Sequence, residues 1–198
     1  MKHRDMNPAP TQDLMSEGRA MLHSPARTAL REAAAALDLA ERFQQPLEMC
    51  LALAQMARCY LGLQALAPAE RYLQQALRWA RTLGAIDQAV EILCLLAETN
   101  CSLAELHARD EARRSHAALE RTRDCAFEIT DLASHVADPE WEIKVLLRIS
   151  DVLDRCGDHD DAMELQSRAM RLMYGDWIGP DGADVPGTLV NMLADHRA

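Results

Sequence analysis

The feature that most constrains the fold is an internal repeat of small and apolar residues. When the 198-residue sequence is shifted by 40 residues, side chains of the same kind fall into register over two successive stretches. A repeat of this length is one supersecondary unit that buries its apolar face against its neighbours, so the pattern predicts a stacked array. The matched pairs are Ala29 with Ala69, Ala36 with Ala76, Leu37 with Leu77, Ala40 with Ala80, Phe43 with Leu83, Leu53 with Leu93, Met56 with Leu96 and Ala57 with Ala97.

Composition favours helices as the repeated elements. Ala, Leu, Arg and Glu dominate, aromatic residues make up 4% of the chain, and β-branched residues are sparse. Such a mixture suits closely packed helices and suits strands poorly. We therefore expect an all-α protein, an α-α superhelix of about eight to nine helices stacked as antiparallel hairpins. A globular helical bundle is the alternative, and it offers no reason for the repeat register.

Helix-breaking residues divide the chain. Ser24-Pro25 and Asp138-Pro139 each place an N-cap residue before a first-turn proline, Pro68 opens a helix that Gly84 ends, and Gly157-Asp158 forms a tight turn. We expect a poorly ordered or weakly helical N-terminus at 1–24, a repeat array at 25–173, and a loop plus a C-terminal capping helix at 174–198. A mobile tail is the rival reading of the last region. The expected helices are 11–22, 25–44, 47–63, 68–83, 87–107, 110–136, 139–155, one from the Gly157-Asp158 turn to 173, and 188–196.

Charge and hydropathy exclude several classes of function. The net charge is −10, and it is uneven: residues 1–84 carry 10 Lys/Arg and 8 Asp/Glu, whereas residues 85–198 carry 11 and 23. A nucleic-acid surface needs a basic patch, so no nucleic acid is expected as partner. No apolar run reaches the roughly 18 residues of a membrane span, and the polar first ten residues resemble no secretory signal. These features predict a cytoplasmic protein with no membrane partner, whose six cysteines are reduced.

The sequence holds no constellation of residues for catalysis. It has no H-E-x-x-H, C-x-x-C, phosphate-binding or dinucleotide-binding motif, and its histidines are scattered, as with His107, His116 and His135. Asp158-His159-Asp160-Asp161 is read as a solvated helix start, because acidic side chains favour the positive end of the helix dipole. We expect no catalytic residues, no metal and no cofactors, and we do not expect an enzyme.

Three segments resemble the tetratricopeptide repeat, whose small residues let paired helices approach closely. The first is Leu53-x-x-Met56-Ala57-x-x-Tyr60, followed by Ala69-x-x-x-Leu73 and Ala76; another is Leu146-x-x-Ile149-Ser150-x-x-Leu153, followed by Ala162 and Ala169. A partial copy is Leu93-x-x-Leu96-Ala97-x-x-Asn100, and its second helix lacks the small-residue register. From Ala57 to Ala97 is 40 residues, but from Ala97 to Ser150 is 53, so the array is irregular. The period near 40 is similar to repeats of bacterial sensors and transcriptional regulators.

The resemblance implies a binding protein whose first helices line a concave groove. Carried over by position, the groove should present Arg58, Leu61, Glu91, Glu98, Lys144, Leu147, Asp151 and Asp154, with Ala54, Cys94 and Cys101 beside them. No Lys and Asn clamp for a C-terminal carboxylate is present. The mixed apolar and acidic lining favours a basic or amphipathic segment of another protein. We expect a scaffold or adaptor; the alternative is a sensor that acts in trans by binding a peptide or ligand.

Overall fold

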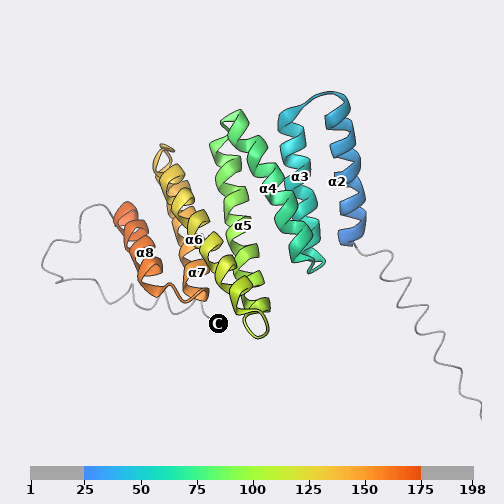
Figure 1. The fold of residues 1–198 in the computed structure, drawn as a ribbon. Helices are drawn as coiled ribbons and strands as arrows, with labels where there is room; N and C mark the ends of the chain where they lie inside the picture. Colours follow the sequence, from blue (N-terminus) through green and yellow to red (C-terminus); the bar gives the residue numbers. More distant parts are fainter. Residues whose placement is uncertain (1–24, 175–198) are drawn as a thin grey trace, which may run out of the picture. The chain divides into compact units, whose positions relative to one another are not determined.

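The computed structural model describes residues 25–174, and in that range the chain is all-α, with seven helices and no strand (Figure 1). This confirms the predicted fold class. The predicted helices 11–22 and 188–196 lie outside the described residues. The helices are α2 (Pro25–Arg42), α3 (Pro46–Gly62), α4 (Leu66–Leu83), α5 (Ile86–His107), α6 (Ala112–Ser134), α7 (Pro139–Arg155) and α8 (His159–Tyr174).

The chain divides into two compact units, Met1–Ile129 and Thr130–Ala198, with the boundary inside α6. Within the first unit, α2 packs on α3, α3 on α4, and α4 on α5, each against the helix next to it in sequence. Within the second unit, α7 packs on α8. Both units are thus built from antiparallel helical hairpins, which is the arrangement that the repeat predicts.

The turns of the first unit follow a common plan. Gln44, Gln64 and Gly84 have φ angles of 51°, 58° and 63°, in the left-handed region. After each of them, the next residue donates its N–H to the carbonyl five residues earlier, at distances of 2.9, 2.9 and 3.0 Å. This bond closes a helix C-terminus by satisfying one of its unpaired carbonyls. The three turn residues are 20 positions apart. The 40-residue repeat is therefore two successive helix–turn steps of equal length.

Helix starts fall within one residue of the predicted positions except at α4 and at α6, which begins at Ala112 and not at 110. Pro46 is in the first turn of α3, and the Asp138 carboxylate accepts a hydrogen bond of 3.1 Å from the Trp141 N–H at the start of α7. The α4 helix begins at Leu66, two residues before Pro68, where the sequence predicted its start. The first four N–H groups of a helix have no partner inside it, so a proline at the third position breaks no bond.

Small residues lie where helices cross. Ala57 of α3 and Ala97 of α5 are both 0% exposed, as their shared place in the repeat predicts. In the second unit, Ser150, Ala162 and Ala169 are buried in the same way. The α6 helix also presents small residues to the core, Ala118, Thr122 and Ala126. Their distance in sequence from Ala97 differs from that between the equivalent small residues of the other two hairpins. The 40-residue register is lost there for this reason.

Candidate interaction face

In its central part, the α5 helix is accessible to solvent along one narrow row of side chains. Between Ala89 and Ala104 every residue is buried except Glu91, Glu98 and Ser102, which are half-buried. Glu105 continues the same line and is exposed. Residues seven apart lie on one face of a helix, so the three glutamates form a single acidic row. Over residues 89–105, these glutamates and Ser102 are the accessible surface of the helix.

The α3 helix presents a parallel row of mixed character. Between Cys50 and Cys59 its unburied residues are Leu51, Gln55 and Arg58. The Arg58 guanidinium donates a hydrogen bond of 3.1 Å to the Glu91 carboxylate, which joins the two rows. Both side chains are about two-fifths exposed, so the pair is open to a ligand. We call these residues of α3 and α5 the α3–α5 face.

Four of the eight predicted groove residues belong to this first unit. Arg58 and Glu91 are brought together by their ion pair, whereas Leu61 and Glu98 are half-buried. Sequence reasoning missed Leu51, Gln55 and Glu105, although the seven-residue spacing of the glutamates was visible in the sequence.

The other four predicted residues form a row on α7, in the second unit. Lys144, Leu147, Asp151 and Asp154 are all exposed. They follow one another at spacings of three or four residues, so they share a face of the helix. The Asp154 carboxylate lies 2.6 Å from Nδ1 of His159, at the start of α8. This row holds two carboxylates, one ammonium and an aliphatic side chain.

Three positions that the sequence placed on the groove are buried instead. Ala54 is 3% exposed, and Cys94 and Cys101 are each 1% exposed. The expectation was wrong because α3 and α5 are covered on both flanks, which leaves a row one side chain wide. Cys94 lies near Cys125 of α6, and burial, helped by Glu128 and Asp124, raises the pKa of Cys125 to about 12. These thiols belong to the core.

A hollow of about 440 Å³ lies between α2 and α3. Small apolar side chains line much of it, namely Ala29, Ala33 and Ala36 from α2 with Leu51 and Ala52 from α3. The remaining lining is polar and includes Glu32, Glu48 and Arg58. Arg58 and Leu51 therefore belong both to this hollow and to the α3–α5 face. We call the hollow the α2–α3 groove.

The described residues contain no cluster of three or more His, Cys, Asp or Glu side chains placed to hold a metal ion. Between residues 25 and 174 no helix is both long and apolar enough to cross a bilayer.

Comparisons with known proteins find similar solved structures but no family. No family model matches the sequence, and no curated protein matches it significantly. Among solved structures, the DHF58 filament is 21% identical with a TM-score of 0.43, covering 87% of this chain and 85% of its own. The de novo designed helical repeat protein DHR64 is 21% identical with a TM-score of 0.43, covering 82% and 92%. The DHF38 filament is 24% identical with a TM-score of 0.41, covering 75% and 76%.

Proposed function

We propose that this chain is a non-enzymatic interaction scaffold of the tetratricopeptide type, which binds a basic or amphipathic segment of a partner protein in the bacterial cytoplasm. The observation that carries the proposal is the single acidic row of α5. Between Ala89 and Ala104, where all residues but Glu91, Glu98 and Ser102 are buried, the helix keeps Glu91 and Glu98 in line with Glu105 on its accessible side. Carboxylates in a row favour a cationic partner, because complementary charge speeds association and selects against acidic proteins.

The tetratricopeptide assignment is supported by packing at the motif positions. Ala57, Ala69 and Ala76 are each 0% exposed, and Tyr60 stacks on Tyr72 with ring centroids 5.3 Å apart. In such repeats the first helix of each hairpin faces the ligand. That role falls to α3 and α5 in the first unit, and to α7 in the second.

The α3–α5 face suits a peptide better than a small molecule. Leu51 supplies an apolar contact, Gln55 a hydrogen-bonding amide and Arg58 a cation, and the glutamates of α5 lie beyond them. An extended or helical segment that lies along the face would contact these groups one after another. In the second unit, the α7 row by itself carries Asp151 and Asp154, which have the same sign of charge.

The experiment is affinity capture from a bacterial lysate followed by mass spectrometry, with wild-type protein and a charge-neutralised variant. The variant carries Glu98→Gln and Asp151→Asn, which keep side-chain size and remove two negative charges. The matched control, Glu41→Gln, removes a charge from the exposed end of α2. One dominant basic partner, held by the wild type and the control and weakened in the variant, is the expected result.

Two other results decide against the proposal. Equal capture of a partner by the variant places binding away from these rows. Recovery of a free peptide or small ligand, with no protein partner, favours the alternative of a sensor that acts in trans. For a captured partner, association should slow as salt rises, because exposed charges are screened over about 8 Å at physiological ionic strength.

A further inference from the structure

The α2–α3 groove has a counterpart in the next repeat that is filled by a helix. A shift of 40 residues carries three of the lining residues of the groove onto residues of α4 and α5. The pairs are Glu32 with Tyr72, Ala36 with Ala76 and Leu51 with Glu91. Each of the three counterparts contacts α3. The α2–α3 groove is therefore equivalent to the place that α3 occupies one repeat later.

Three contacts define how α3 lies in that counterpart. They are the hydrogen bond of 3.4 Å from the Cys50 Sγ to the Ala76 carbonyl oxygen, the stacking of Tyr60 on Tyr72 with ring centroids 5.3 Å apart, and the hydrogen bond of 3.1 Å from Arg58 to the Glu91 carboxylate. These contacts join one helix to two others, α4 and α5. A helix that lay in the α2–α3 groove in the same way would contact Glu32, Ala36 and Leu51.

The floor of the groove is made of smaller side chains than its counterpart. Ala33 and Ala52 line the groove at the positions that Leu73 and Ile92 take in the next repeat. All four residues are buried, so they form the floor and not the rim. An occupant of the groove must supply the missing volume. It therefore needs large apolar side chains on its buried face.

Two carboxylates on opposite walls set the charge of the groove. Glu32 of α2 and Glu48 of α3 are exposed, and within residues 25–174 neither has an ion-pair partner. Their counterparts Tyr72 and Gln88 are uncharged. Arg58 is the one cation among the lining residues, and it is already engaged in its ion pair with α5. The groove therefore favours a cationic occupant, with a basic residue on each side of its apolar face.

We propose that the α2–α3 groove binds a cationic amphipathic helix of a partner protein, which lies there as α3 lies against α4 and α5. This inference rests on the proposed function and names the place and the conformation of the partner's segment. The helix presents a Lys or Arg to Glu32 and an aliphatic side chain to Leu51. Because Leu51 and Arg58 also belong to the α3–α5 face, a longer segment continues from the groove onto the acidic row of α5.

The test is the binding of a synthetic helical probe to the full chain, measured by fluorescence anisotropy. The probe has about 14 residues, roughly 21 Å of helix at 1.5 Å per residue, with leucines on one face, lysines along both sides of it and alanines elsewhere. The control peptide has the same composition in an order that gives the leucines no common face. The chain should bind the control at least about tenfold more weakly than the probe, because only the probe buries an apolar face.

A pair of variants tests whether the probe lies in the groove. Ala36→Phe fills the groove from an exposed position, so it should weaken binding of the probe at least about tenfold through steric exclusion. Its control, Ala35→Phe, adds the same ring at an exposed neighbour that does not line the groove, and it should bind the probe as the wild type does.

A second pair tests the role of charge. Glu32→Gln with Glu48→Gln removes both carboxylates and should weaken binding about fivefold at low salt, with a smaller effect at high salt. The matched control, Glu41→Gln with Glu164→Gln, removes two exposed charges away from the groove. It lowers the net charge of the chain by the same amount, so it separates pairing in the groove from attraction to an acidic protein.

Three outcomes would overturn the inference. Equal binding by Ala36→Phe and Ala35→Phe places the probe outside the groove. Binding that survives the loss of Glu32 and Glu48 but weakens in Glu98→Gln places the probe on the acidic row of α5, which leaves the proposed function intact. A wild-type chain that does not bind the probe has its groove closed by another segment or by a second copy. Failure of the proposed function is seen separately, as lysate capture that yields no basic partner.

Discussion

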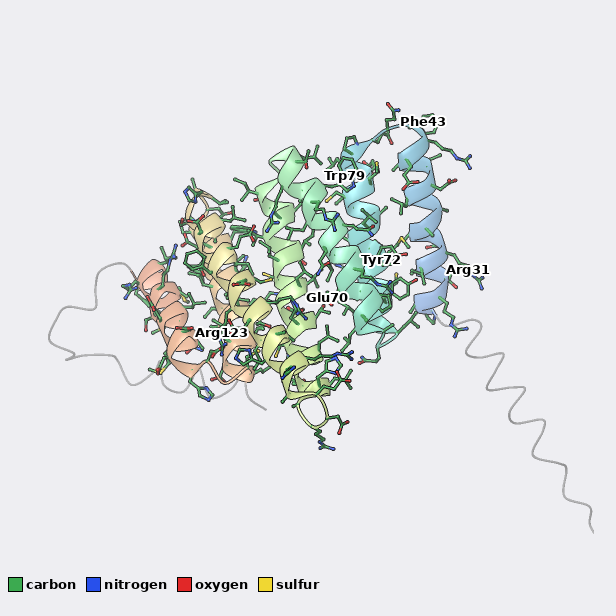
Figure 2. The ribbon with its side chains drawn as sticks, viewed as in Figure 1. Arg31, Phe43, Glu70, Tyr72, Trp79 and Arg123 are labelled. Carbon is green, nitrogen blue, oxygen red and sulfur yellow. The ribbon has the colours of Figure 1, made fainter. Side chains whose placement is uncertain are left out.

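Arg121 of α6 donates a hydrogen bond of 3.1 Å from Nε to the side-chain oxygen of Asn100 in α5. Asn100 is 2% exposed, and it occupies the repeat position at which Tyr60 of α3 stacks on Tyr72. Arg121 also lies 3.2 Å from the Glu70 carboxylate on α4, labelled in Figure 2. A polar contact within the α5–α6 hairpin thus replaces the aromatic contact of the preceding α3–α4 hairpin.

Arg121→Met should destabilise the first unit. The substitution keeps the aliphatic stem but leaves the buried Asn100 oxygen without its donor, which costs about 1–3 kcal/mol. Urea denaturation measures the loss, with Arg113→Met on the exposed face of α6 as control. Adding Asn100→Leu to Arg121→Met should recover part of it, because the unsatisfied group is then removed. If the double variant is no more stable than Arg121→Met, the unsatisfied Asn100 oxygen is not the cause of the loss.

Enlarging Ala57 should overpack the contact between α3 and its neighbours. Ala57 is 0% exposed, so the added methyl groups of Ala57→Leu must displace packed atoms, at a cost of about 1–3 kcal/mol. The matched control is Ala117→Leu on the exposed side of α6, which should leave the melting temperature nearly unchanged. If both variants have the melting temperature of the wild type, Ala57 does not lie in a close-packed helix contact.

Much of the helical layout could be predicted from the sequence because prolines, glycines and the repeat register mark it. Gly84 and Gly157 are left-handed turn residues with φ angles of 63° and 84°, as their residue type indicates. The equivalent turns at Gln44 and Gln64 carried no such signal. Glutamine rarely adopts this conformation, and here it is held by the backbone bonds that close the helices.

The candidate site was harder to predict than the fold. The positions carried over from the tetratricopeptide repeat assigned a broad exposed face to α5, but the helices around it bury Cys94 and Cys101 and leave one row open. Burial on both flanks of a helix depends on neighbours distant in sequence, which local periodicity does not encode. The α2–α3 groove likewise depends on which helix covers α2, and no single segment of the sequence states this.

Cys125 makes the stability of the fold sensitive to alkaline pH. Burial is the main cause that raises the pKa of Cys125 to about 12, from an ordinary value of 9.0. The unfolded chain therefore loses this proton first, so the stabilisation is complete below pH 9 and is lost as pH rises toward 12. In that window wild-type stability should fall more steeply than that of Cys125→Ala, by at most about 1.4 kcal/mol per pH unit. Parallel pH profiles of unfolding free energy would contradict this.

The Asp138 cap should account for a measurable part of the stability of α7. Its carboxylate accepts from the Trp141 N–H, so Asp138→Ala leaves that donor unpaired at the helix start. The expected cost is about 0.5–2 kcal/mol by thermal or chemical denaturation. Asp138→Asn keeps an accepting oxygen and should lose much less. Equal losses in the two variants would mean that the charge, and not the hydrogen bond, stabilises this end.

Packing between helices that are neighbours in sequence also sets how the first unit folds. Each of α2, α3 and α4 contacts the next helix along the chain, so its contacts close short loops. Short loops cost little entropy to close, and helical proteins rich in local contacts fold in about microseconds to milliseconds. Formation can begin at any hairpin and spread by addition of the adjacent helix. Opening should start at α2, which has one described neighbour, and reach α3 and α4 later, since each of them packs between two helices.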